Sequence, residues 1–338
     1  MDIRSESLNW SSGKPSRGCK EIGMLTVTLN PSLDICATVP VVESERKMRC
    51  TNITTEPGGG GVNVARVVVR FGESVTAAVF LREDSSAEFL SLLVDESVPV
   101  RVVPVSGQMR EGFTAQEAST SRQFRFVLPG PTLSPDEFAA GIEQVVGHCA
   151  DEQLVVLSGS SPPGVSPSDL ARLVGRIRRA GREVIADVPG DALAEVSAVG
   201  VLLVKPSVRE LSEFAGRSLA GHGDIEHAAL DLLATGATGA ALISMGPAGV
   251  LLVRLGHATL WFHAPHVETH STIGAGDSLV GGVAIALQRG ATLPEACRFG
   301  VAAGTAATLA TGTGLCQAAD VERLVPDVLV TARAGIGR

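Results

Sequence analysis

The stretch S-T-I-G-A-G-D-S, from Ser271 to Ser278, places two glycines and an alanine directly before an aspartate. The apolar segment L-V-G-G-V-A follows, so the stretch predicts a tightly packed helix from Asp277 onward. Unpaired N–H groups at a helix N-terminus can hold an anion, and small residues at 274–276 let it approach closely. A carboxylate beside that anion could take a proton from a hydroxyl during phosphoryl transfer. The stretch alone leaves open a second interpretation, in which Asp277 only caps the helix.

Outward from this stretch, the chain alternates between short apolar segments and longer segments with helical spacing of apolar residues. Strands that alternate with helices are typical of a mainly parallel sheet with helices on both faces, so the sequence predicts an α/β fold. Strands are expected at Met24–Leu29, Val75–Leu81, Leu154–Ser158, Glu183–Asp187, Val201–Val204, Ala240–Ser244, Gly249–Val253 and Thr259–His263, and helices at Val62–Phe71, Ala87–Glu96, Ser168–Ala180, Val208–Glu213 and Asp224–Thr235.

Residues 35–55 and 106–128 do not follow this rhythm, because polar and apolar residues alternate in them as in exposed strands. We expect them to form a small β-sheet, the lid, inserted into one α/β domain that spans residues 24–338. Val98–Val105 is expected to be a further antiparallel strand. Residues 1–23 are polar and lack the apolar segment of a signal peptide, so they are expected to be a flexible N-terminal extension.

The chain of 338 residues carries 28 lysines and arginines against 36 aspartates and glutamates, a net charge of −8. This balance argues against nucleic-acid or anionic-membrane partners, which need a basic face. No apolar run reaches the roughly 18 residues of a transmembrane helix. The six cysteines form no C-x-x-C pair, as expected of reduced thiols, and a cytoplasmic location is predicted.

Several motifs in a fixed order resemble those of the PfkB-type, or ribokinase-like, carbohydrate kinases, over about residues 24–325. The resemblance implies a three-layer α/β/α sandwich with a mainly parallel central sheet and a small β-sheet lid, and it is strongest to the phosphofructokinase branch. Beside the stretch at 271–278, the motifs are L-N-P-S-L-D (Leu29–Asp34), K-M-R-C (Lys47–Cys50), E-P-G-G-G-G-V-N-V-A-R (Glu56–Arg66), Q-F-R-F-V-L-P-G (Gln123–Gly130), S-G-S-S-P-P-G (Ser158–Gly164) and V-K-P-S-V-R-E (Val204–Glu210).

The resemblance assigns roles for the acceptor sugar by position. Asp277 is expected to be the general base, with an anion hole formed by Gly274, Ala275 and Gly276. From the residues alone, a turn aspartate is favoured for Asp34 and a helix cap for Asn63, and the basic side chains could form a solvated edge. The expected sugar contacts are Asp34, Gly59, Gly60, Asn63 and, from its loop, Ser160, and the expected 6-phosphate contacts are Lys47, Arg49 and Arg110.

The resemblance also implies ATP as phosphoryl donor, with Mg²⁺ held by Glu210 and Asp187 through water. Four positions, in three places of the chain, depart from the family pattern. Ser207 replaces an asparagine of the metal motif, Arg82 replaces a glycine near the sugar site, and Ala310 and Gly314 replace polar groups, which leaves K⁺ activation open. The expected nucleotide contacts are Lys205, Ser207, Ser244, Gly246, Gly249 and Thr272.

Together these features predict an enzyme that converts fructose 6-phosphate and ATP to fructose 1,6-bisphosphate and ADP. The alternatives are a kinase for tagatose 6-phosphate, fructose 1-phosphate or another sugar or nucleoside, and a catalytically weak sugar-phosphate sensor. The edges and apolar face of an exposed lid need cover, so a homodimer that pairs through the lid is expected.

Overall fold

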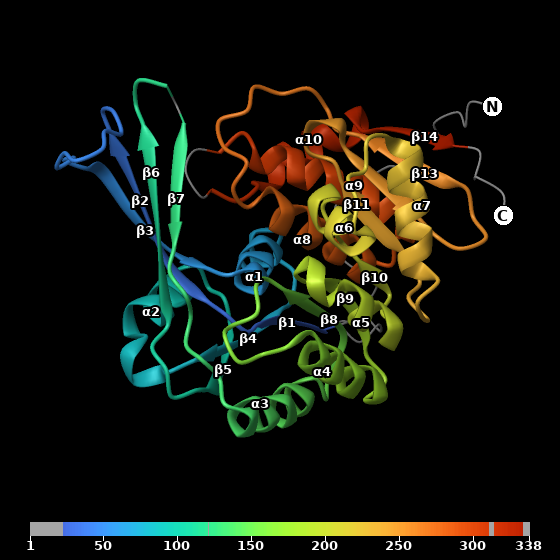
Figure 1. The fold of residues 1–338 in the computed structure, drawn as a ribbon, viewed down its shortest axis with the longest axis horizontal. Helices are drawn as coiled ribbons and strands as arrows, with labels where there is room; N and C mark the ends of the chain where they lie inside the picture. Colours follow the sequence, from blue (N-terminus) through green and yellow to red (C-terminus); the bar gives the residue numbers. More distant parts are fainter. Residues whose placement is uncertain (1–22, 121, 311–313, 334–338) are drawn as a thin grey trace.

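A ten-stranded sheet forms the centre of the molecule (Figure 1). The computed structural model describes residues 23–120, 122–310 and 314–333, so most of the expected N-terminal extension lies outside the described residues. The strand order is β14-β13-β12-β11-β10-β9-β8-β1-β4-β5. In chain order the strands are β1 (Gly23–Thr28), β4 (Thr76–Leu81), β5 (Val100–Pro104), β8 (Glu152–Ser158), β9 (Glu183–Asp187), β10 (Leu203–Val204), β11 (Ala241–Ser244), β12 (Val250–Val253), β13 (Thr259–His263) and β14 (Leu329–Arg333).

Neighbouring strands run parallel from β5 through to β11, and only β12, β13 and β14 are added antiparallel. The expectation of a mainly parallel sheet is therefore confirmed. The antiparallel direction expected for 98–105 is wrong, because β5 pairs parallel to β4 with Val79 opposite Val102. The helix between β4 and β5, at Ala87–Asp95, returns the chain so that β5 runs in the same direction as β4. Polar and apolar residues alternate in β5 because it is an edge strand with one exposed face.

Helices cover both faces of this sheet and give the three-layer sandwich (Figure 1). The helix expected from Asp277 onward is the first of two consecutive helices, α8 (Ala275–Gln288) and α9 (Leu293–Ala307). Helix α3 (Pro135–His148), which is not expected from the sequence, begins at a capping box of Ser134 and Glu137. One face carries α1 (Gly60–Arg70), α2 (Ala87–Asp95), α8 (Ala275–Gln288), α9 (Leu293–Ala307) and α10 (Ala318–Leu324), and the other carries α3 (Pro135–His148), α4 (Pro167–Arg179), α5 (Leu193–Val199), α6 (Val208–Ala215) and α7 (His222–Leu233).

The second sheet has four strands in the order β3-β2-β6-β7 and projects from one side of the sandwich (Figure 1). It corresponds to the lid expected from the sequence. The strands β2 and β3 form one antiparallel pair, β6 and β7 form another, and β2 joins the two pairs by running parallel to β6. The bounds are β2 (Ser32–Val39), β3 (Thr51–Gly58), β6 (Arg110–Glu117) and β7 (Gln123–Val127).

The carboxyl ends of the central strands meet along one edge of the large sheet, where ligands bind in open α/β folds. Ser158 ends β8, Asp187 ends β9, and Lys205 follows β10 directly. This edge therefore gathers the polar groups from which a site can be built. Among the described helices, none has the length and apolar character needed to cross a membrane.

Candidate active site

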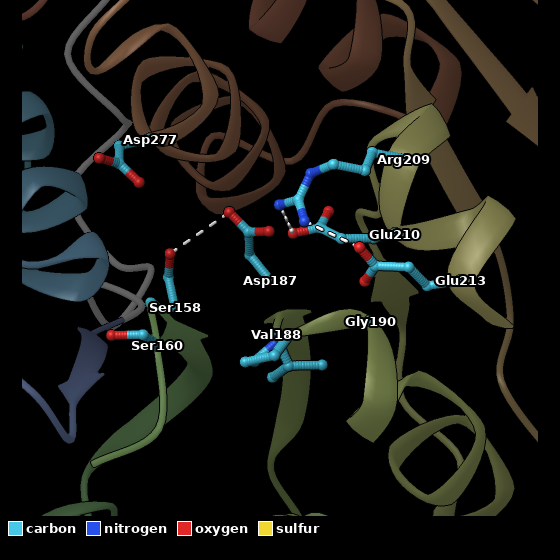
Figure 2. Close-up of a pocket in the computed structure, with 11 residues that line it drawn as sticks. Ser158, Ser160, Asp187, Val188, Gly190, Arg209, Glu210, Glu213 and Asp277 are labelled. Carbon is cyan, nitrogen blue, oxygen red and sulfur yellow. Dashed lines mark hydrogen bonds and ion pairs between the residues drawn. The ribbon is translucent and has the colours of Figure 1, made fainter. Parts of the chain in front are cut away.

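Two cavities open along this edge and share part of their walls. The sheet cavity, of about 350 Å³, lies between the ends of β8 and β9 and helix α6 (Figure 2). The lid cavity, of about 530 Å³, lies between the lid and the starts of α1 and α8. Both cavities are lined by Gly159, Ser160, Arg209 and Asp277. A group transferred from one cavity to the other would therefore pass Asp277.

Asp277 lies in the first turn of α8, which begins after Gly274. Gly274 has the left-handed φ of 73°, which glycine adopts without strain and which turns the chain into the helix. The Asp277 carboxylate is partly buried, and its Oδ2 accepts a hydrogen bond of 2.8 Å from Asn63 Nδ2. Burial raises the pKa of Asp277 to about 6, against the opposing effect of the Asn63 hydrogen bond. A carboxylate with this pKa can act as a base near neutral pH.

The start of α8 also lies near a buried cation. A Cβ placed on Gly276 would be 4.0 Å from Lys205 Nζ, and Lys205 is only 5% exposed. Its ammonium group pairs with Asp187 at 3.0 Å. Burial opposes charge on this lysine, but the neighbouring Asp187 raises the pKa of Lys205 above its usual value, while burial raises the pKa of Asp187. The helix terminus and Lys205 together make this corner suited to a negative group.

On the lid side, Asp34 projects from β2 between two glycines of the neighbouring strands. A Cβ on Gly58 of β3 would approach Asp34 Oδ2 to 2.2 Å, and one on Gly112 of β6 would approach Oδ1 to 2.4 Å. Larger residues at either position would displace the carboxylate, so the glycines make room for it. Asp34 lines the lid cavity with Gly59, Gly60 and Asn63, which brings these four expected sugar contacts together.

Two arginines from the lid face the same cavity. Arg110, at the start of β6, is half-buried and donates from Nε to the Asn30 carbonyl oxygen at 3.2 Å. Burial lowers the pKa of Arg110, with Asp34 raising it and the positive charge of Arg125 lowering it further. Arg125, on β7, also lines the cavity. Two like charges facing one space favour an anion between them.

The expected partners Lys47 and Arg49 are not brought to this cavity. Both lie in the exposed connection between β2 and β3 and line neither cavity. Ser160, by contrast, lines both, and its Oγ accepts a hydrogen bond of 3.2 Å from Asn30 Nδ2. The structure thus gathers one of the three expected phosphate cations and adds Arg125.

Ser207, the departure from the family's asparagine, caps helix α6. Its Oγ accepts from the Glu210 N–H at 3.2 Å, while its own N–H and hydroxyl both donate to Glu210 Oε2 at 2.8 Å. This reciprocal capping box fixes the Glu210 side chain at the wall of the sheet cavity. Arg209 reaches over the same wall, where it pairs with Glu213 at 2.8 Å (Figure 2).

Three of the remaining expected nucleotide contacts lie along the same sheet edge. Ser244 ends β11 and bridges to Ser207, while Gly246 and Gly249 form the turn that follows. Thr272 is exposed in the segment before α8. These four residues and Lys205 are not among the lining residues of the two cavities.

Arg82, the second departure, lies away from both cavities. It pairs with Asp84 at 2.6 Å and is largely exposed. Arg125, Arg209 and Asn30 were missed by the sequence reasoning, although each lies inside a quoted motif. Their spacing gives no sign of which side chain faces a cavity.

Comparison with known proteins connects this geometry to a family. The model of the pfkB family carbohydrate kinases matches residues 27–320. The ATP-dependent 6-phosphofructokinase isozyme 2 of Escherichia coli is 40% identical over 305 residues, which cover 90% of this chain and 98% of that protein. A 1-phosphofructokinase from Vibrio cholerae is 30% identical over 311 residues, 91% of this chain and 96% of that protein. The crystal structure of phosphofructokinase-2 from E. coli in complex with fructose-6-phosphate superposes with a TM-score of 0.83 at 37% identity, covering 91% of this chain and 99% of that one.

Proposed function

The chain belongs to the pfkB family of carbohydrate kinases, and we propose from this premise that it transfers a phosphoryl group from ATP to fructose 6-phosphate. The products are fructose 1,6-bisphosphate and ADP. The chain is 40% identical to a 6-phosphofructokinase and 30% identical to a 1-phosphofructokinase, which favours fructose 6-phosphate over fructose 1-phosphate as the acceptor.

One observation carries the proposal: the lid cavity and the sheet cavity meet at Asp277. In the proposed reaction the sugar lies in the lid cavity and its primary hydroxyl faces Asp277. Asp277 Oδ takes the hydroxyl proton as the oxygen attacks the γ-phosphorus and ADP leaves. The N–H groups of Gly274, Ala275 and Gly276 and the charge of Lys205 stabilise the transferred phosphoryl group.

Mg²⁺ fits the acidic wall of the sheet cavity through water. Asp187 pairs with Lys205 through Oδ1 and accepts a hydrogen bond of 3.4 Å from Ser158 Oγ through Oδ2. Glu210 Oε2 accepts from Ser207, and Glu210 Oε1 lies 3.9 Å from Arg209 Nη2. A carboxylate oxygen accepts more than one hydrogen bond, so both side chains can also hold water molecules around a cation. Mg²⁺ prefers oxygen ligands and keeps several of its waters. When bound, it would neutralise charge on the ATP phosphates. We assign Asp187 and Glu210 to this role.

The nucleotide itself is proposed to lie along the sheet edge beyond Mg²⁺. Lys205 and Arg209 supply positive charge there, and Gly246 leaves open space at the turn after β11. The expected contacts Ser207, Ser244, Gly246, Gly249 and Thr272 are retained in this proposal. Whether K⁺ binds near Ala310 and Gly314 stays a prediction, because residues 311–313 between them lie outside the described residues.

The lid is proposed to bind the 6-phosphate and to pair with a second copy. Arg110 and Arg125 would hold the phosphate, and closure of the lid would add Lys47 and Arg49 and exclude water. Its apolar side chains Ile53, Phe126 and Val127 are 64%, 56% and 60% exposed, which supports a homodimer through the lid. The single domain of residues 24–338 and the cytoplasmic location also stay predictions.

The first test is ADP release at fixed Mg·ATP with a panel of acceptors. We expect the highest kcat/KM with fructose 6-phosphate. Fructose, which lacks the phosphate, should be worse by about 10²- to 10⁴-fold, since each hydrogen bond to a charged group contributes about 1.5–3 kcal/mol and at least two, to Arg110 and Arg125, are lost. A preference for tagatose 6-phosphate, fructose 1-phosphate or a nucleoside would reassign the acceptor. Binding of fructose 6-phosphate without ADP release would favour the sensor.

Replacement of Arg110 by alanine tests the phosphate site. We expect the KM for fructose 6-phosphate to rise about 10- to 100-fold while the KM for ATP stays within about twofold, because Arg110 faces only the lid cavity. Arg122→Ala is a matched control, since Arg122 lies beside β7, is 66% exposed and pairs with Glu117 away from both cavities. Equal increases in both KM values for Arg110→Ala would mean that the arginine is structural.

A further inference from the structure

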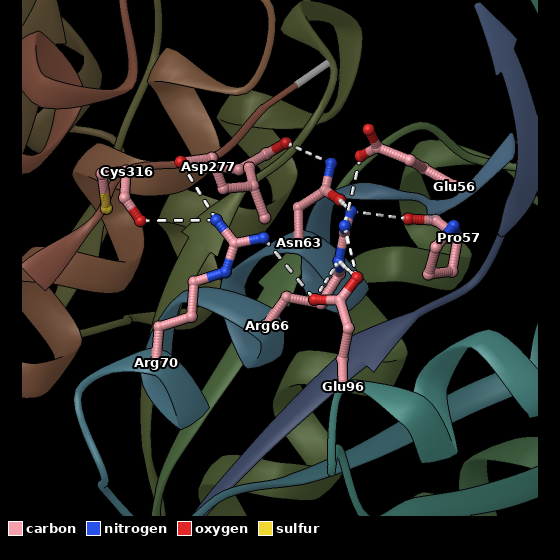
Figure 3. Close-up of polar contacts among 9 residues, drawn as sticks. Glu56, Pro57, Asn63, Arg66, Arg70, Glu96, Asp277 and Cys316 are labelled. Carbon is pink, nitrogen blue, oxygen red and sulfur yellow. Dashed lines mark hydrogen bonds and ion pairs between the residues drawn. The ribbon is translucent and has the colours of Figure 1, made fainter. Parts of the chain in front are cut away.

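Arg66, on α1, is a buried cation that holds several groups at once (Figure 3). Its side chain is 4% exposed. Nε and Nη2 donate to the Glu96 carboxylate at 2.6–2.9 Å, and Nη2 also reaches Glu56 Oε2 at 3.2 Å. Nη1 donates to the Pro57 carbonyl at 3.0 Å and to Asn63 Oδ1 at 3.3 Å. The guanidinium therefore connects the end of α2, the lid strand β3 and the amide of Asn63.

The contact with Asn63 decides which way this amide points. A guanidinium only donates hydrogen bonds, so the atom of Asn63 that faces Arg66 must be the oxygen. The NH₂ group then points away, toward Asp277 Oδ2 at 2.8 Å. Without Arg66, one of the two contacts that hold the amide in this orientation is lost, and the amide oxygen can turn to accept a hydrogen bond from Asp277 when that carboxyl group is protonated, which favours the protonated form.

We propose that Arg66, anchored by Glu96, is a positioning residue that holds Asn63 as a hydrogen-bond donor to Asp277. Arg66 touches no reacting atom; it acts through Asn63. The inference rests on the proposed function for its effect on catalysis, because there Asp277 is the base. Its effect on the Asp277 carboxylate itself does not depend on the reaction.

The other groups that face Asp277 come from different elements and do not depend on Arg66. Lys205 and Asp187 lie at the sheet edge, Arg125 faces Asp277 from the lid, and Arg209 lies on α6. Lys205 and Arg125 favour the charged carboxylate, and Asp187 opposes it. Loss of the Asn63 donor should therefore raise the proton affinity of Asp277 while these charges stay in place.

The test is Arg66→Lys, because an ammonium group lacks the planar fork with which Arg66 reaches Glu96 through Nε and Nη2 and Asn63 through Nη1. We expect the acid limb of the kcat/KM profile to move up by about one pH unit, so that activity falls about tenfold well below that limb and little above it. The same shift should be seen in the ¹³C resonance of the Asp277 carboxyl group, identified as the signal lost in Asp277→Asn. This second measurement needs no turnover.

The matched control is Arg289→Lys. Arg289 follows α8 directly and pairs with Glu73, which follows α1, at 2.8 Å. It therefore connects the helices that carry Asn63 and Asp277, at the ends farthest from these two residues, and does not contact Asn63. We expect lower thermal stability and an unchanged acid limb. An equal shift in this control would show that any loosening of α1 against α8 changes Asp277, and would overturn the proposal.

A double-mutant cycle separates the remaining explanations. In Asn63→Ala, the donor is already absent, so adding Arg66→Lys should move the Asp277 signal no further. If Arg66→Lys does not fold, Glu96→Ala removes the anchor and should give a smaller shift in the same direction. Unchanged Asp277 titration in these folded variants would overturn the positioning role. Full activity of Asp277→Asn would instead overturn the proposed function, leaving the NMR result to decide the inference.

Discussion

Asp277→Asn is expected to lower kcat by about 10²–10⁴-fold, the range that general-base catalysis typically contributes. Asparagine has the same shape and can still accept the hydrogen bond from Asn63, so the change removes the proton acceptor and little else. The KM for fructose 6-phosphate should change much less. Initial rates of ADP release measure both parameters, and near-normal turnover would remove Asp277 from the mechanism.

The pH dependence of the rate is a second test of Asp277 as the general base. Asp277 has a pKa of about 6, so the wild-type rate should fall about tenfold per pH unit below that value, as the base becomes protonated. The residual activity of Asp277→Asn should lack this limb. A wild-type profile that stays flat through pH 6 would contradict the assigned base.

The same substitution should increase stability. The pKa of Asp277 is higher in the folded protein than in the unfolded chain, so the folded state binds more protons and loses stability as pH rises from about 4 to about 6. Above pH 6, a shift of about two units corresponds to roughly 3 kcal/mol. Asp277→Asn should recover part of this at neutral pH and little at pH 4. Chemical denaturation at the two pH values measures the difference.

Lys205→Met is expected to have the second large effect. It leaves the buried Asp187 carboxylate without its partner at 3.0 Å, and breaking a buried ion pair in this way costs about 3–5 kcal/mol. It also removes a positive charge from the start of α8, so kcat should fall. Denaturation and ADP release measure the two effects separately.

The control for this prediction is the double variant with Asp187→Asn. A neutral amide no longer needs the ammonium group, so the double variant should recover most of the stability of the wild type but none of the lost turnover. Recovery of both would mean that Lys205 serves the fold alone. Full stability of Lys205→Met would mean that water in the sheet cavity and the Ser158 hydroxyl stabilise the Asp187 carboxylate well enough to replace the ammonium group.

The sandwich and the start of α8 could be predicted from the sequence because they depend on local patterns. Apolar strands separated by helices specify a parallel sheet, and two glycines before Asp277 specify a helix start. The direction of β5 could not be predicted in this way, since alternation in 98–105 describes exposure and not the path of the chain. The start of α3 carries a capping signature at Ser134 and Glu137, which by itself does not predict a helix.

The site depends on contacts that no local pattern contains. Asn63 and Asp277 meet across 214 positions of sequence, and Arg66, which pairs with Glu96 at the end of α2, donates directly to Asn63. Membership of a motif does not show where a side chain points. Lys47 and Arg125 are both basic residues in motifs of the family, yet only Arg125 lines the lid cavity. Which side chain of a motif points inward is set by strand register, and the register is fixed by residues elsewhere.

The parallel pairing of β2 with β6 has a consequence for the order in which the protein folds. Ser32 lies opposite Arg110 and Asp34 opposite Gly112, although 78 residues separate the members of each pair. Contacts between segments so distant in sequence form slowly, because the intervening loop must close first. Each hairpin of the lid carries only part of the acceptor site: Asp34 belongs to one, and Arg110 and Arg125 to the other. We therefore expect sugar-phosphate binding to return during refolding only when the two hairpins have paired, later than the formation of each hairpin.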